Sequence, residues 1–260
     1  MIWRGLLVSV RDGDEAAEAL AGGCAIIDVK EPLAGPLGAA APATVAAIAA
    51  IVSNSSPWTL ACGELLDAAA DAEAGRRRAL AFVADVCQKL AAAPAPAAVK
   101  VGLSGAVGTP WREALGGIAA GLPAGTGLVA VAYADWQRCR APNLEDLVVA
   151  AAAIGCRGVL VDTFDKVGPG LFGQADRDTI GRWVTLAHAA GLPIALAGKL
   201  GLDDVASAVA VGADVVGVRS VACRAGRSAG GDGDRLGTVH RDRVRRAVDR
   251  FAAALPAAGG

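Results

Sequence analysis

Primary amines are scarce in this sequence, and their positions point to chemistry. Lysine and arginine together number 25, but only five of them are lysines. Lys89 falls in a predicted helix, whereas the other four lie at or just beyond the ends of predicted strands: Lys30, Lys100, Lys166 and Lys199. A lysine held out of bulk water and near other ammonium groups has a lowered pKa, and its neutral amine can attack a carbonyl carbon. The pattern therefore indicates amine-based covalent chemistry.

Two aspartates accompany these amines. Side chains alternate between the faces of a strand, so Asp28 and Lys30 in "IIDVKEP" share one face. The same alternation turns Lys100 in "AVKVGL" and Asp162 in "VLVDTF" toward the interior of a barrel. Carboxylates there can shuttle protons. A structural interpretation also stays open, in which Asp28 with Lys30, or Asp162 with Lys166, form salt bridges that hold a rim together.

The elements that must position these residues follow a regular alternation. Short β-rich runs are separated by helix-length amphipathic or Ala-rich segments, which indicates successive βα units around a parallel sheet. Eight strands are predicted, namely Leu6–Val10, Ala25–Lys30, Trp58–Gly63, Ala98–Leu103, Gly127–Tyr133, Gly158–Thr163, Pro193–Ala197 and Val215–Arg219. Helices are predicted near 14–22, 42–53, 67–92, 110–120, 143–154, 175–190, 202–210 and 239–255. Eight such units predict an α/β fold, a single (β/α)8 TIM barrel, whose strand ends would gather the four amines at one mouth.

A doubly wound open sheet shares this alternation. Against it, no G-x-G-x-x-G follows the first strand, where "VSVRDGDE" stands instead. A chain of 260 residues also suits one barrel. We therefore predict one domain over residues 1–260, with a Gly-rich loop at 224–237 and a frayed tail at 257–260. The loop could serve as a lid or be a plain solvated segment.

Composition excludes several classes of partner. The net charge of -1 and the pI near 6.1, without a long basic stripe before the Arg-rich tail, argue against nucleic acid. The sequence offers neither a membrane span nor a signal peptide, which favours a soluble, cytoplasmic protein. Six scattered cysteines and two histidines predict reduced core thiols and no metal site. Ala-rich helices such as 143–154 offer apolar faces for a homo-oligomer.

The segments after the seventh and eighth strands indicate a phosphate site. They read "ALAGKLGLDD" and "GVRSVACRAGR", and the corresponding loops of many barrels bind phosphate through backbone N–H groups and a helix N-terminus. Glycine lets the backbone approach a ligand closely, and Lys199, Arg219 and Arg224 would add positive charge. Turn chemistry alone would also explain the glycines. The candidate phosphate-binding residues are Gly198, Lys199, Gly217, Arg219 and Ser220.

Taken together, these motifs resemble the (5-formylfuran-3-yl)methyl phosphate synthases of methanofuran biosynthesis. The resemblance runs nearly end to end and rests on "LLVSVRDGDEAAEALAGGCAIIDVKEP" with "GPLGA", on "VKVGL", "VAYAD" and "VDTFDK", and on "LAGKL" followed by "GADVVGVRSVAC". The first block and the "DT-x-x-K" block are the most specific, because they place two Asp-Lys pairs on separate strands. Two features depart from the expected pattern: Lys199 stands where a small residue is expected, and the 224–237 loop is longer and richer in glycine.

The resemblance implies a cofactor-free lyase that joins two molecules of glyceraldehyde 3-phosphate with loss of phosphate and water. Carried over by motif, Lys30 would form the imine and Lys100 would be the proton acceptor, with Asp28, Asp162 and Lys166 assisting. A protonated imine withdraws electrons from the neighbouring carbon, so a base can remove its α-proton and leave an enamine that attacks the second aldehyde. The choice between Lys30 and Lys100 for the imine rests on the motif and not on spacing.

Two other functions stay open from the residues. One is a different barrel enzyme, a Schiff-base aldolase or a phosphosugar isomerase, which shares the lysine and phosphate chemistry. The other is a sensor that binds a triose phosphate without catalysis, its lysines acting only as phosphate clamps. Fold alone does not separate these functions, because one architecture hosts many chemistries.

Overall fold

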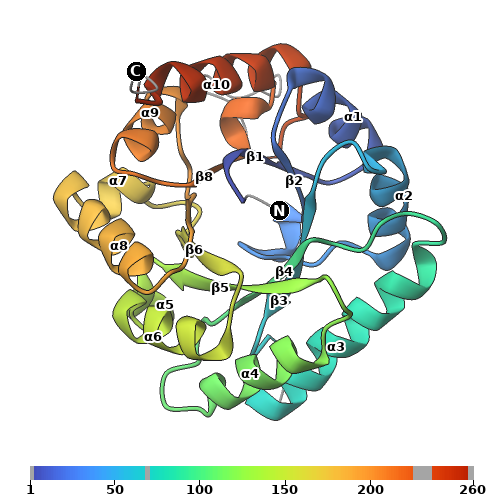
Figure 1. Ribbon diagram of the computed structural model, residues 1–260, viewed down its shortest axis with the longest axis vertical. Coiled ribbons are helices and arrows are strands. Elements are labelled where there is room, and N and C mark those ends of the chain that lie inside the picture. The colour runs from blue at the N-terminus through green and yellow to red at the C-terminus, as the bar shows by residue number, and fades with distance from the viewer. Residues whose placement is uncertain (1–2, 68–70, 225–235, 257–260) are drawn as a thin grey trace.

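Eight parallel strands close into a barrel in the computed structural model, and the helices form an outer ring around it (Figure 1). The structure describes residues 3–67, 71–224 and 236–256. Neighbouring strands pair in chain order, and β1 pairs with β8 as well as with β2, which excludes the open sheet. The predicted single (β/α)8 barrel is confirmed. The strands are β1 (Gly5–Val10), β2 (Ile26–Val29), β3 (Trp58–Glu64), β4 (Ala98–Gly102), β5 (Gly127–Tyr133), β6 (Gly158–Asp162), β7 (Ile194–Leu196) and β8 (Val215–Val218).

Every predicted helix is present; the helix at 202–210 has the predicted bounds, and each of the others differs from its predicted range at one end or both. The helices are α1 (Gly13–Gly22), α2 (Pro42–Val52), α3 (Ala72–Lys89), α4 (Trp111–Gly121), α5 (Trp136–Cys139), α6 (Leu144–Ile154), α7 (Leu171–Gln174), α8 (Arg177–Ala189), α9 (Leu202–Ala210) and α10 (Arg241–Ala254), with 3-10 turns η1 (Pro32–Ala34) and η2 (Ser220–Ala222). The two short helices α5 and α7 and both 3-10 turns were not predicted. Most of the 224–237 loop, and the 257–260 tail, lie outside the described residues.

Polar caps explain where several helices begin. The side chains of Asp12, Asp71, Asn143 and Asp176 each accept a hydrogen bond from a backbone N–H in the first turn of α1, α3, α6 and α8, respectively. Such a cap satisfies a donor that the helix itself leaves unpaired, and it is worth about 1 kcal/mol. Asp71 thereby sets the start of α3 later than the 67–92 pattern predicts.

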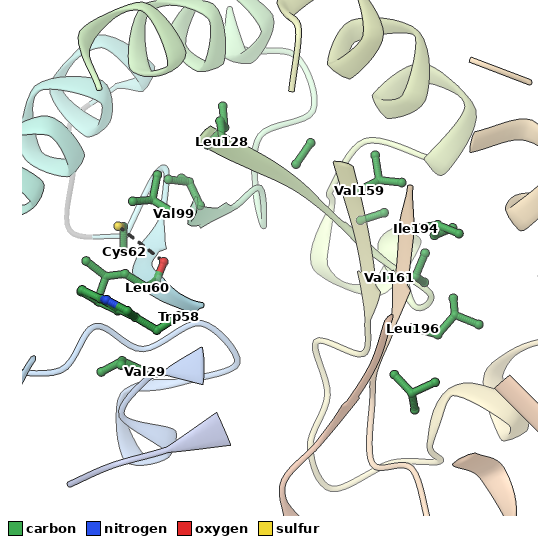
Figure 2. Packing of buried hydrophobic residues seen from close by; sticks show 14 of the residues in the cluster. Val29, Trp58, Leu60, Cys62, Val99, Leu128, Val159, Val161, Ile194 and Leu196 are labelled. Carbon is green, nitrogen blue, oxygen red and sulfur yellow. Dashed lines mark hydrogen bonds between the residues drawn. The ribbon is translucent and has the colours of Figure 1, made fainter. Parts of the chain in front are cut away.

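Alternation along the strands divides the core into two layers. Outward side chains of β2, β3, β4, β6 and β7 belong to one buried cluster with residues of the surrounding helices; Figure 2 labels Val29, Leu60, Val99, Val161 and Leu196 among its members. Inward side chains form a second cluster within the barrel. Near the carboxyl ends of the strands, the positions that face the barrel interior carry charged residues. The same period of two that builds the outer core therefore aims the site residues inward.

All six cysteines carry free thiols, and every one except Cys87 is buried. Among the described residues, no helix combines the length and the hydropathy that crossing a membrane requires. Searched over the same residues, the chain shows no group of three or more His, Cys, Asp or Glu side chains able to hold a metal ion.

Candidate active site

All ten residues predicted for the site line one cavity at the carboxyl ends of the strands. They are Asp28, Lys30, Lys100, Asp162, Lys166, Gly198, Lys199, Gly217, Arg219 and Ser220. These residues come from β2, β4, β6, β7 and β8 and the loops that follow, so barrel closure brings together positions far apart in the sequence. Their individual roles stay predictions.

Asp28 lies at the centre of one hydrogen-bonded cluster. Its Oδ1 accepts from Lys100 Nζ and from Thr59 Oγ1 at 2.8 Å, and its Oδ2 accepts from Ser9 Oγ at 3.0 Å. All four side chains are buried, none being more than 3 % exposed. The salt bridge thus joins Asp28 to Lys100, not to Lys30 as one structural interpretation of the sequence had it.

Asp162 holds the second cluster. Its Oδ1 accepts from Lys166 Nζ at 2.7 Å and from the backbone N–H of Thr163 at 2.7 Å. Lys166 Nζ also lies 3.4 Å from Thr163 Oγ1. The predicted Asp162–Lys166 salt bridge is confirmed, and it fixes this amine at the rim of the cavity.

Lys30 differs from the other two amines. Within the described ranges its ammonium group takes part in no salt bridge, although the charges of both Asp162 and Asp28 act on it. Burial lowers the pKa of Lys30 to about 8; the two carboxylates oppose this change, while the ammonium groups of Lys166 and Lys100 add to it. An amine in this state is partly neutral near physiological pH and able to attack a carbonyl carbon.

The two aspartates remain ionised in spite of their burial. Burial alone would raise the pKa of Asp28, but the ammonium groups of Lys100 and Lys30 outweigh it, so the pKa lies below its ordinary value. The same balance, with Lys166 and Lys30 as the cations, lowers the pKa of Asp162. The site therefore pairs two fixed anions with two bound ammonium groups, and it leaves one amine of lowered pKa beside them.

The loop after β7 adopts an unusual backbone at the cavity. Gly198 has φ +106° and Lys199 has φ +53°, both in the left-handed region. A Cβ on Gly198 would lie 2.9 Å from Thr163 Cγ2, so glycine lets this loop approach the end of β6. Lys199 Nζ donates to the carbonyl oxygens of Val167, at 3.2 Å, and Gly168. The lysine that departs from the expected pattern thus ties the β7 loop to the β6 loop.

Arg219 lines the cavity, but its guanidinium is bound to protein atoms. It forms a salt bridge with Glu15, a residue of α1 that is fully buried. Burial would raise the pKa of Glu15, but the hydrogen bond and charge of Arg219, together with contacts from Arg11, lower it below its ordinary value. The role of Arg219 as a phosphate ligand stays a prediction, and Glu15 was not identified from the sequence.

Sequence reasoning also missed Ser9 and Thr59, which flank Asp28 in the barrel. The strand register pairs Ser9 with Asp28 and Asp28 with Thr59, so the three side chains share the inner face. The available signal was a single hydroxyl residue in each of two otherwise apolar runs, "LLVSV" and "WTLACG". That signal lacks meaning until the register between strands is known.

A bulge near the end of β3 places one more missed carboxyl group. The β3–β4 register shifts there, and Gly63 has φ +83°. Glu64 accepts hydrogen bonds from Tyr133 Oη and, at 2.9 Å, from the backbone N–H of Ser104. A Cβ on Gly102 would lie 2.2 Å from Glu64 Oε2, so the missing side chain makes room for this carboxyl. Burial raises the pKa of Glu64.

A closed parallel barrel that gathers four lysines and two aspartates at the carboxyl ends of its strands is the architecture of a TIM-barrel enzyme. Comparison of the sequence with protein families narrows this class. The family model described as 4-HFC-P synthase matches residues 6–247. The chain belongs to the 4-HFC-P synthase family.

Curated relatives agree with the family. The (5-formylfuran-3-yl)methyl phosphate synthase of Methanopyrus kandleri is 35 % identical over 227 residues, covering 85 % of this chain and 90 % of the relative. The enzyme of the same name from Methanocaldococcus jannaschii is 32 % identical over 236 residues, covering 88 % and 94 %. The predicted family resemblance is confirmed.

Solved structures agree with the fold. Thiamine phosphate pyrophosphorylase from Pyrococcus furiosus superposes with a TM-score of 0.60 at 14 % identity, covering 98 % of both chains. Orotidine 5'-phosphate decarboxylase from Pyrococcus horikoshii superposes with a TM-score of 0.59 at 15 % identity, covering 95 % of this chain and 99 % of the other. At such identities the likeness shows the barrel architecture alone.

Proposed function

We propose that the protein is a (5-formylfuran-3-yl)methyl phosphate synthase of methanofuran biosynthesis that uses Lys30 as its Schiff-base nucleophile. It would condense two molecules of glyceraldehyde 3-phosphate, and loss of one phosphate and two waters balances the atoms of the furan product. The observation that carries the proposal is the contrast among the amines. Lys100 and Lys166 are held in salt bridges, whereas Lys30 forms none with the residues that the structure describes and has a lowered pKa. Family membership supports the choice of reaction.

The first steps follow from this geometry. Neutral Lys30 attacks the aldehyde carbon of the first triose, and the hydroxyl of the resulting carbinolamine leaves as water with a proton taken from the Lys100 ammonium, which gives a protonated imine and a neutral Lys100 amine. Neutral Lys100, held by Asp28, then accepts the proton from the adjacent carbon. The resulting enamine attacks the carbonyl carbon of the second triose. Lys166, whose ammonium group is held by Asp162, is placed to protonate the groups that leave in the later eliminations.

The phosphate group of the substrate is assigned to the β7 and β8 side of the cavity. Gly198, Lys199 and Ser220 line that side. The absence of a side chain on Gly198 lets a ligand approach the backbone, and the Lys199 ammonium adds positive charge to the rim. Gly217 lies inside β8 and also lines the cavity; a Cβ there would lie 3.1 Å from Ala197 Cβ.

Borohydride trapping tests the nucleophile. Incubation with glyceraldehyde 3-phosphate and sodium borohydride should reduce the imine and leave a stable triose adduct on the peptide that contains Lys30, detected by mass spectrometry. Lys30→Met should give no adduct, whereas Lys89→Met, a control in the exposed part of α3, should be modified like the wild type. An adduct on Lys100 or Lys166 instead would reject the assignment, and no adduct at all would favour a triose-phosphate sensor.

Product analysis tests the reaction. A conjugated furan aldehyde absorbs ultraviolet light where trioses do not, so product should accumulate as a new absorbance together with free phosphate. Dihydroxyacetone phosphate as the product would indicate an isomerase, and a six-carbon product that retains both phosphates would indicate an aldolase. Either outcome would keep the amine chemistry and discard the synthase.

A further inference from the structure

A second buried salt bridge lies beside the site, and the reaction steps described above assign it no role. Arg219, just after β8, is 6 % exposed, and Glu15, in the first turn of α1, is 0 % exposed. Arg219 Nη1 lies 2.8 Å from Glu15 Oε2, and Nη2 lies 3.2 Å from Oε1, which is a two-pronged contact. The backbone N–H of Arg11 donates to Glu15 Oε2 at 2.9 Å. The Glu15 carboxylate is therefore held both by the Arg219 guanidinium and by the Arg11 backbone.

The guanidinium group of Arg219 is committed to protein acceptors. Besides the two contacts with Glu15, Nη1 donates to the carbonyl oxygen of Ser9 at 2.9 Å, and Nη2 donates to that of Gly237 at 3.1 Å. Each terminal nitrogen of a guanidinium carries two N–H groups, so these contacts occupy all four. A phosphate that bound Arg219 through either terminal nitrogen would have to displace one of them, and the charge of Glu15 already offsets that of Arg219.

Ser9 connects this pair to the amine site. Its carbonyl oxygen accepts from Arg219, while its hydroxyl donates to Asp28 Oδ2 at 3.0 Å. Asp28 in turn holds Lys100. The chain of contacts runs from α1 through the end of β8 and along β1 to β2, and every side chain in it is buried. A shift of the Ser9 backbone would move the hydroxyl that orients the carboxylate of Asp28.

We propose that Arg219 and Glu15 are positioning residues that act through Ser9 to orient Asp28, and that Arg219 does not bind the substrate phosphate. The salt bridge anchors the Ser9 carbonyl, and the Ser9 hydroxyl then holds Asp28 Oδ2 while Oδ1 is left for Thr59 and Lys100. The kinetic consequence rests on the proposed synthase function, because there Asp28 presents Lys100 to the substrate. The orientation of the Asp28 carboxylate by Ser9 does not depend on which reaction the protein catalyses.

Carbon-13 NMR titration of the aspartate carboxyl groups tests the structural part. The charged groups that face Asp28 are Lys100 and Lys30, and Ser9 and Thr59 donate to it. Loss of the Ser9 donor disfavours the ionised form, so Ser9→Ala should shift the titration of Asp28 upward, and Glu15→Gln and Arg219→Lys should shift it in the same direction. Ser207→Ala, which removes a buried hydroxyl of α9 that binds Arg177, should leave it unchanged. An unmoved Asp28 in Glu15→Gln and Arg219→Lys would overturn the proposal.

Steady-state kinetics then separate a positioning role from a phosphate ligand. Misplacement of Asp28 should lower kcat about ten- to a hundredfold with little change in KM, in Glu15→Gln and Arg219→Lys alike. Arg219 and Glu15 both act through the Ser9 hydroxyl. The double variant Ser9→Ala/Arg219→Lys should therefore lose less kcat than the product of the fold losses of the two single variants. A large rise in KM confined to Arg219→Lys would identify a phosphate ligand and overturn the proposal. If the wild type forms no furan product, the proposed function fails, and the titration still decides the role of Arg219.

Discussion

Lys30, Lys100 and Lys166 are all lysines, but their environments in the cavity differ. Lys100 and Lys166 each form a salt bridge with an aspartate, whereas burial without a salt bridge among the described residues lowers the pKa of Lys30 to about 8. At that value roughly one amine in ten is neutral at pH 7, against about one in three thousand for an ordinary lysine. Environment, not residue type, therefore distinguishes the nucleophile from its neighbours.

The pKa of Lys30 predicts the pH dependence of the reaction. Only the neutral amine forms the imine, so kcat/KM should rise about tenfold per pH unit below pH 8 and level off above it, until a second group titrates. Measurement of kcat/KM across pH 5.5 to about 9.5 would locate this limb. A flat profile through that range would contradict Lys30 as the group that must lose a proton.

Lys166→Met should shift the rising limb of the pH profile of kcat/KM. The ammonium group of Lys166 helps to lower the pKa of Lys30, and its removal also frees Asp162 to attract the Lys30 proton. Both effects raise the pKa of Lys30, so the limb should move to higher pH in the variant. Movement to lower pH would show that Lys166 acts on some other group.

At the scale of elements, special backbone positions shape the mouth of the barrel. The bulge in β3 turns Glu64 toward β4 and β5, and left-handed Gly198 brings the β7 loop against Thr163. Bulges and left-handed glycines recur beside active sites because they re-aim side chains or bring backbone segments together. These features decide where side chains point, while the regular parts of the strands supply the rigid support.

Gly198→Ala should be costly. The residue has φ +106°, and the new Cβ would meet Thr163 Cγ2 at 2.9 Å and its backbone nitrogen at 3.0 Å. We expect a loss of about 1–3 kcal/mol in the free energy of unfolding, together with reduced turnover, because Thr163 follows directly on Asp162. Denaturant titration and steady-state assays would measure both.

Gly181→Ala is the matched control. Gly181 lies within α8, and a Cβ there would meet nothing within 4 Å. Alanine is the better helix former by roughly 0.5–1 kcal/mol, so this variant should be as stable as the wild type or more stable. Equal losses in the two variants would mean that crowding by the β6 loop is not the cause.

At the scale of the whole molecule, the barrel depends on the outer core that joins strands to helices. Leu60 of β3 is 0 % exposed and belongs to this cluster (Figure 2). Leu60→Ala should lower the free energy of unfolding by about 2–5 kcal/mol, since it removes buried methyl groups and leaves a cavity. Leu33→Ala, at a side chain 74 % exposed, should change it by less than about 0.5 kcal/mol. Denaturant titration would compare the unfolding midpoints of the two variants. Equal shifts would contradict the placement of Leu60 in the outer core.

Assembly belongs to the same scale. The sequence predicts a homo-oligomer from Ala-rich helices such as 143–154, and Val149 of α6 is 69 % exposed. A single exposed valine is common on monomeric proteins, so the oligomeric state stays a prediction.

By itself, the sequence determined the βα repeat and which face of each strand a side chain occupies. Eight βα units predicted the barrel, and the period of two turned Asp28, Lys30, Lys100 and Asp162 inward, because both signals are local to each segment. Helix starts such as Asn143 were also local, since a cap depends only on the next few residues. Family motifs added the family, which the family-model match confirms, and the reaction that we propose.

Only the tertiary structure decided which groups are partners. Asp28 binds Lys100, 72 residues away, and not its near neighbour Lys30, while Arg219 binds Glu15 across the junction of β8 and α1. Ser9 and Thr59 meet Asp28 only through strand register, and Glu64 turns inward only through a bulge. The physical reason is that spacing along a strand selects a face, whereas barrel closure and register select the neighbour on that face.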